Sequence, residues 1–146
     1  FTETQILFLG IFINLSGIIG CLILGRYEDK FGSERTVLIC IVSLFLSTFF
    51  LYFTKGYETF WVLALLIGFF IGPIQAASRS VIVKKIKSRD QLSAFCSFAM
   101  FGNICAILGP FLVSLIIDYS GNIRYGLMVI PTFLLLSLIP FKKISV

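Results

Sequence analysis

The stretch GRYEDKFGSER, residues 25–35, joins two long apolar runs and decides how the rest of the chain is interpreted. Its spacing is Gly-x-x-x-Asp-Lys-x-Gly-x-x-Arg, formed by Gly25, Asp29, Lys30, Gly32 and Arg35. The glycines allow a tight turn between two helices. The carboxylate can sit near the N-terminus of an adjacent helix, and the basic residues can pair with carboxylates or anionic headgroups. The alternative interpretation is an ordinary charged loop at a membrane surface.

Apolar stretches on both sides of this segment are long enough to cross a membrane. Uncharged runs cover residues 6–24, 36–54, 60–77, 92–117 and 126–141, so all 12 basic and seven acidic residues lie outside them. Charged residues make up 13% of the chain, against about 25% in soluble domains. With helix ends included, we expect transmembrane helices at 6–24, 36–54, 60–77, 88–117 and 123–141. The fourth begins at a capping-box pattern from Ser88 to Gln91. The fold class is an all-α integral membrane protein with five transmembrane helices.

The basic residues indicate an orientation. Connections after the first and third spans, together with the C-terminal tail, carry ten Lys and Arg, whereas Lys55 and Arg124 alone lie on the other side. The positive-inside rule then places the N-terminus outside and the C-terminus in the cytoplasm. Because the chain starts on the outer side with Phe1, without a signal peptide, we expect further spans upstream of it.

The residue types argue against catalysis and against nucleic-acid binding. The net charge of +5 comes from residues between apolar runs, which is topology rather than a nucleic-acid-binding face. There is no histidine, and the four cysteines lie singly within apolar runs. We therefore expect no metal, no cofactor and no enzymatic activity.

A second motif, GPIQAASRS, follows within the third span at residues 72–80. Gly68 and Gly72 form a Gly-x-x-x-Gly pair that permits close helix packing, and Pro73 weakens the helix locally. Gln75 is either an interhelical hydrogen-bonding residue or a contact for a transported solute. Residues at the expected cytoplasmic interface follow, where the basic side chain can simply reach the headgroups: Ser78, Arg79 and Ser80.

A third motif lies in the fourth span, where Gly102, Gly109 and Pro110 are packing or hinge positions. Asn103 falls near the middle of that span, and Asn14 lies at a similar depth in the first span. Both amides are open to the same two interpretations as Gln75: helix–helix hydrogen bonding, or the wall of a solute cavity.

These motifs resemble a known transporter family. The 25–35 segment is similar to the signature of the major facilitator superfamily. The GPIQAASRS stretch with Gly102 and Leu108-Gly109-Pro110 looks like its vacuole-effluxer-like branch, which includes autophagy-related amino-acid effluxers. The resemblance implies a partial chain: helices eight to twelve of a twelve-helix carrier, with the N-terminal half as the missing partner. It also implies that residues 25–35 act as a conformational latch and that the second and fifth spans lie at the periphery.

The implied function is secondary active or facilitative transport of a small solute, such as amino acids, by rocking of two halves in the bilayer. Heavy use of Phe, Ile and Lys suggests a bacterial inner membrane. The rival interpretations are a non-transporting scaffold or assembly subunit, which close-packed glycine motifs also allow, and a membrane enzyme, for which no catalytic group is visible.

Overall fold

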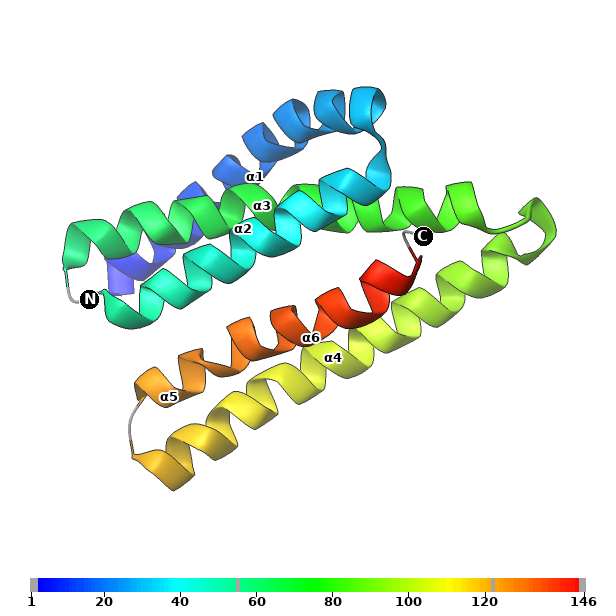
Figure 1. Cartoon of the computed structure of the whole chain (residues 1–146). Helices are drawn as coiled ribbons and strands as arrows, with labels where there is room; N and C mark the ends of the chain where they lie inside the picture. Colours follow the sequence, from blue (N-terminus) through cyan, green and yellow to red (C-terminus); the bar gives the residue numbers. More distant parts are fainter. Residues whose placement is uncertain (1–2, 55, 122, 145–146) are drawn as a thin grey trace.

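The chain folds into a bundle of helices, seen in a computed structural model (Figure 1). The structure describes the backbone of residues 3–54, 56–121 and 123–144, and the side chains of residues 3–54, 56–121 and 125–138. The described residues contain no strand. The elements are α1 (Glu3–Phe31), α2 (Ser33–Phe53), α3 (Tyr57–Lys85), the 3-10 turn η1 (Ser88–Asp90), α4 (Gln91–Ser120), α5 (Ile123–Leu127) and α6 (Val129–Ile144).

The predicted all-α membrane fold is confirmed. Within the described residues, four helices are long and apolar enough to span a membrane: α1, α2, α3, and α4 with its 3-10 turn. A shorter apolar helical stretch follows over Tyr125–Leu138. The helices α1 and α3 continue beyond the predicted limits at residues 24 and 77, to Phe31 and Lys85. Hydropathy marks only the part of a helix that meets hydrocarbon, whereas the backbone pattern continues into the polar interface.

The fifth predicted span is divided. Helix α5 ends at Leu127, Met128 forms a turn through a 3.2 Å hydrogen bond from its amide to the Tyr125 carbonyl, and α6 begins at Val129. This restart puts Pro131 into the first turn of α6. A proline is tolerated there because the amide that it lacks would be unpaired in any case.

Helix α2 contributes more buried residues to the described chain than α1, α3 or α4. The peripheral position that the resemblance implies concerns a complete carrier and stays a prediction. Helix α2 packs against α3 and α6, and Val37 and Ile41 of α2 meet Ala77 of α3 in the main apolar cluster. Its small polar residues are buried because they bond to their own helix; Thr48, for example, donates to the Leu44 carbonyl at 2.8 Å. The opposite face of α2 exposes large apolar side chains, among them Val42, Leu46 and Phe50.

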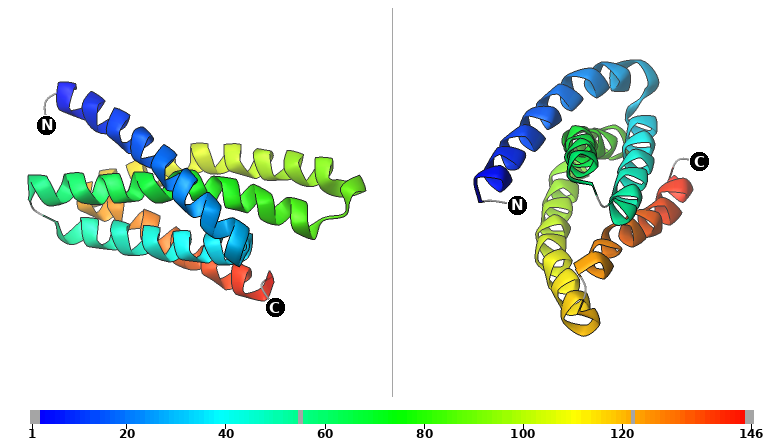
Figure 2. Two further views of the ribbon diagram at one scale, coloured as in Figure 1. Left: turned by 90° about the horizontal axis from the view of Figure 1, so that it is seen from above. Right: turned by 90° about the vertical axis from the view of Figure 1, so that its left-hand side faces the viewer.

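Helices α1 and α3 form a seam lined by glycines, where α1 crosses α3 obliquely (Figure 2). A Cβ atom on Gly20 would lie 1.9 Å from the Phe69 carbonyl oxygen, and one on Gly68 would lie 2.6 Å from the Ile13 carbonyl oxygen. The two backbones are thus too close for any side chain at these positions. At one end of the seam, Phe12 packs edge-on against Trp61 with ring centroids 6.3 Å apart.

Helix α4 stands apart from this packing. It contacts α5 and, more sparsely, α3, and none of its residues is buried within the described chain.

The predicted capping box is wrong. Helix α4 starts at Gln91 without a side-chain cap, and the Gln91 amide instead donates to the carbonyls of Val83 and Ile86, at 3.1 and 3.2 Å. Capping the last turn of α3 satisfies carbonyl groups that the helix end leaves unpaired.

Candidate functional site

A groove on the α1–α3 seam brings two of the three predicted amide residues together. It has a volume of about 440 Å³, and both Asn14 and Gln75 line it. The Asn14 amide nitrogen donates to the Gly10 carbonyl of its own helix at 2.8 Å, so its oxygen is left to accept. Gln75 is exposed and makes no hydrogen bond with any described residue. The rest of the lining is neutral: Ile13, Gly17, Ile18, Cys21, Leu22, Gly68, Ile71 and Gly72.

The structure separates the third amide from this groove. Asn103 is exposed on α4 and is not part of the groove lining. Neither it nor Gln75 bridges two helices in the described chain. Between α1 and α3 that hydrogen bond comes from Ser16, whose hydroxyl donates to the Leu65 carbonyl at 2.9 Å. A serine can reach a neighbouring backbone only where small residues bring the helices close, as the adjacent Gly17 does here.

The predicted packing positions fall in two different environments. Gly68 and Gly72 lie in the α1–α3 seam, and the neighbouring Pro73 is buried within an uninterrupted α3. On α4, a Cβ atom added to Gly102 or Gly109 would meet nothing within 4 Å. Pro110 is likewise exposed within α4.

The predicted latch segment, residues 25–35, is almost entirely helical. Gly25, Asp29 and Lys30 belong to the end of α1, and Arg35 lies in the first turn of α2. The single connecting residue is Gly32, whose φ of 94° strains any other residue type. Asp29, Lys30 and Arg35 are all exposed, so their charges point away from the packed helices.

The residues between these motif positions make short polar contacts with the end of α1 and with α3. The Ser33 hydroxyl donates to Glu28 Oε1 at 2.6 Å and accepts a 2.7 Å hydrogen bond from Lys84 Nζ. Glu34 Oε1 pairs with Lys85 Nζ at 2.7 Å. Sequence reasoning missed this set. The sequence does contain a pattern that could have indicated it, a serine and an acid at positions 33 and 34 and a lysine pair at positions 84 and 85.

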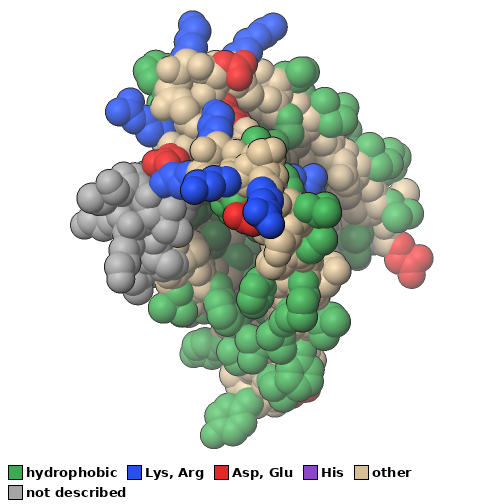
Figure 3. Space-filling model, turned by 90° about the vertical axis from the view of Figure 1, so that its right-hand side faces the viewer, with side chains coloured by type: hydrophobic (Ala, Val, Ile, Leu, Met, Phe, Trp, Pro, Cys, Tyr) green, Lys and Arg blue, Asp and Glu red, His purple; other side chains and the backbone are tan. Residues whose placement is uncertain are grey.

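The residues predicted at the cytoplasmic interface lie on α3, one to two turns before this polar set. The Ser78 hydroxyl donates to the Ile74 carbonyl of the same helix at 2.6 Å. Arg79 is exposed and Ser80 is half-buried. Figure 3 shows that Lys and Arg gather at this end of the molecule, which we term the basic end. Within the described residues, no three His, Cys, Asp or Glu side chains are placed to share a metal ion.

Comparison with known proteins identifies the family. The sequence model of the Major Facilitator Superfamily matches residues 1–144. The "Uncharacterized MFS-type transporter YxiO" of Bacillus subtilis is 29% identical over 101 residues, covering 69% of this chain and 24% of the relative. Autophagy-related protein 22 of Cryptococcus neoformans is 23% identical over 158 residues, covering 97% of this chain and 28% of the relative.

A third relative is the "Multi-drug resistance efflux pump PmrA homolog" of Lactococcus lactis, 29% identical over 138 residues, with 90% of this chain and 33% of the pump covered. The chain therefore spans about a quarter to a third of the length of these relatives. No solved structure matches it significantly. The printed names of two of these relatives describe a transporter and an efflux pump. The described helices are apolar and long enough to span a membrane, and the family model matches nearly the whole chain. This chain is therefore a multi-pass membrane protein that belongs to the Major Facilitator Superfamily.

Proposed function

We propose that this chain forms part of a secondary or facilitative carrier, and that the α1–α3 groove is one wall of its solute path. The observation that carries this proposal is the pairing of Asn14 and Gln75 in one groove among apolar residues. Polar side chains at membrane depth are costly unless they face a cavity or a partner. The solute is a small molecule, with amino acids as the first class to test, since the vacuole-effluxer resemblance and the matched autophagy-related proteins favour them.

The remaining components of the carrier are the bilayer and further helices of a longer protein. The relatives are three to four times the length that this chain covers, which supports an N-terminal half that completes the path. We assign the basic end to the cytoplasmic side on the positive-inside rule. The heavy use of Phe, Ile and Lys favours a bacterial inner membrane. Transport then proceeds by rocking of the two halves around the solute.

The groove is tested by measuring uptake of a radiolabelled amino-acid mixture into proteoliposomes that contain the whole protein. Asn14→Ala and Gln75→Ala each remove a hydrogen-bonding group, worth about 0.5–1.5 kcal/mol, so we expect KM to rise about 2- to 10-fold. Ser97→Ala is the control, because the Ser97 hydroxyl bonds only to the Ser93 carbonyl of its own exposed helix.

The outcomes of this assay separate the candidates. An unchanged KM in both amide variants, with wild-type uptake present, would remove the groove from the solute path. A rise in KM in Asn103→Ala as well would extend the solute path to α4. Absence of uptake for every solute tested would favour the scaffold interpretation, in which the glycine seam serves assembly alone.

The latch proposal is tested at Asp29. A latch stabilises one end-state of the conformational cycle, so Asp29→Asn shifts the equilibrium between states and leaves the binding groups in place. We expect the maximal uptake rate to fall several-fold while solute affinity, measured by equilibrium binding, changes less than twofold. Asp90→Asn is the control, since Asp90 is also an exposed acid at the basic end. Equal rates in Asp29→Asn and wild type would contradict the latch.

A further inference from the structure

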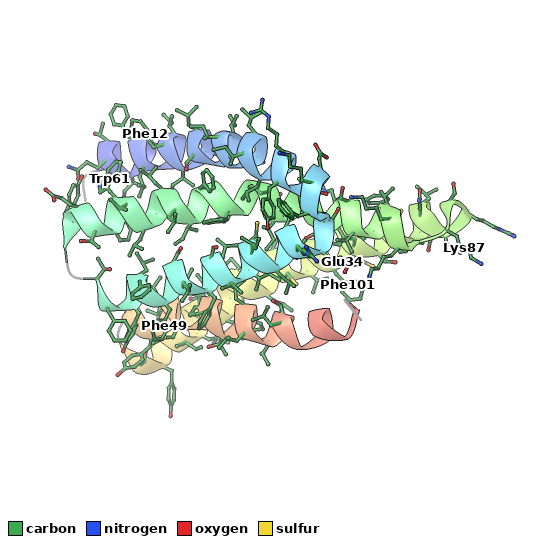
Figure 4. The ribbon with its side chains drawn as sticks, turned by 45° about the horizontal axis from the view of Figure 1, so that its top comes forward. Phe12, Glu34, Phe49, Trp61, Lys87 and Phe101 are labelled. Carbon is green, nitrogen blue, oxygen red and sulfur yellow. The ribbon has the colours of Figure 1, made fainter. Side chains whose placement is uncertain are left out.

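Three polar contacts, in two groups, link three helices at the basic end of the bundle. In the first, Ser33 stands between Glu28 and Lys84, giving the hydroxyl proton to the carboxylate and accepting from the ammonium. In the second, Glu34 pairs directly with Lys85. Figure 4 shows Glu34 at the α1–α2 turn, where the chain passes beside α3.

The serine and the acids of this set are shielded from water to different degrees, whereas both lysines are exposed. Ser33 is only 3% exposed, although its hydroxyl links two ionised groups, and Glu28 is half-buried. The Lys85 and Glu34 side chains are 37% and 35% exposed. Exposed ion pairs contribute little, but hydrogen bonds to charged groups strengthen when they are short and shielded from water.

The helix ends favour the same arrangement. Glu34 lies in the first turn of α2, where the helix dipole favours an acid, and Lys84 and Lys85 lie in the last turn of α3, where it favours a base. The one-residue turn at Gly32 joins α1 to α2, and both contacts with α3 start from the first turn of α2. Glu28 of α1 is linked to them through the Ser33 hydroxyl. The exposed latch residues Asp29 and Arg35 are then carried on a rigid support.

We propose that Glu28, Ser33, Glu34, Lys84 and Lys85 form a clamp that positions the latch segment on α3, so that α1, α2 and α3 move as one unit during transport. These are positioning residues: none lines the α1–α3 groove, and they act by holding Asp29 and Arg35 in place. The link to transport rests on the proposed carrier function. The link between the helices does not, and it can be measured in the absence of any solute.

The test is a double-mutant cycle on the whole protein in lipid nanodiscs, read by hydrogen–deuterium exchange of amides 34–37 and 82–86. Glu34→Gln and Lys85→Gln each break the same contact, so each is expected to speed exchange about 2- to 10-fold. The double variant is expected to be no faster than the worse single variant. The control cycle combines Glu34→Gln with Lys87→Gln instead of Lys85→Gln. Lys87 is an exposed lysine in the α3–α4 connection, and this cycle is expected to be additive.

The Ser33 contact has its own matched pair. Ser33→Ala removes both of its hydrogen bonds and is expected to speed exchange at the same amides, whereas Ser93→Ala, on the exposed face of α4, is not. Additive effects of Glu34→Gln and Lys85→Gln, or equal effects of Ser33→Ala and Ser93→Ala, would overturn the clamp.

Uptake into proteoliposomes then tests the positioning role. Glu34→Gln and Ser33→Ala are expected to lower the maximal uptake rate severalfold with little change in solute affinity, as for Asp29→Asn. Unchanged rates, with exchange accelerated, would overturn the positioning role. Failure of the carrier proposal is distinguishable from both outcomes, because wild-type protein would then show no uptake while the exchange cycle still decides the clamp.

Discussion

The α1–α3 seam and helix α4 carry similar residue patterns in opposite environments. Both contain glycines at small-x-x-x-small spacing and an asparagine near mid-helix. In the seam, a Cβ atom on Gly20 or Gly68 would collide with backbone, whereas Gly102 and Gly109 of α4 face open space. Small residues therefore permit close approach of helices but do not produce it.

The difference lies in the partner. Seam glycines occur on both helices at matching depth, so that Gly72 of α3 faces Gly17 of α1 and each backbone fits the gap in the other. Among the described helices, α5 brings Gly126 against α4, but it meets the side chains of Ile117 and Val113 rather than a matching glycine. Van der Waals packing drives association between membrane helices, and it requires two complementary surfaces.

The largest effect on stability is expected from one methyl group added to a seam glycine. Gly20→Ala places a carbon 1.9 Å from the Phe69 carbonyl oxygen, so the backbones must separate. Overpacking of this kind costs about 1–3 kcal/mol. The matched variant Gly109→Ala meets no atom within 4 Å and is expected to be neutral or slightly stabilising, because alanine favours helix. Reversible unfolding in mixed micelles measures both. Equal stability of the two variants would contradict the seam.

A smaller effect is expected from the interhelical hydrogen bond. Ser16→Ala removes the 2.9 Å contact to the Leu65 carbonyl, and such bonds contribute about 0.6 kcal/mol in membrane proteins. Ser97→Ala removes a 2.9 Å bond within α4 alone and is expected to leave stability unchanged. The same unfolding measurement applies. If Ser97→Ala lowered the free energy of unfolding as much as Ser16→Ala does, the serine hydroxyl would act within its own helix in both regions.

Much of the fold follows from the sequence because charge and hydropathy are segregated along the chain. This segregation predicted the all-helical membrane class. It did not predict the helix ends, since α1 and α3 continue into polar interface where hydropathy gives no signal. The turn before α6 was also missed, although Pro131 was visible, because a proline can kink a helix as readily as start one.

The site was less accessible to sequence reasoning than the fold. The pairing of Asn14 with Gln75 required knowledge of which helix faces which, and periodicity within uniformly apolar helices does not provide it. The contacts of Ser33 and Glu34 with the lysines of α3 join residues about fifty positions apart. The direct packing of α2 against α3, with α2 starting right after the single-residue turn at Gly32, brings those groups together.

The packing of Trp61 against Phe12 gives the seam its own optical reporter. Trp61 is the one tryptophan among the 146 residues, and its indole nitrogen is buried without a hydrogen-bond partner among the described residues. Indole emission shifts to longer wavelength when water reaches the ring, and neighbouring groups quench it by contact. The intrinsic fluorescence of this chain therefore follows the separation of α1 from α3 directly, without an introduced dye.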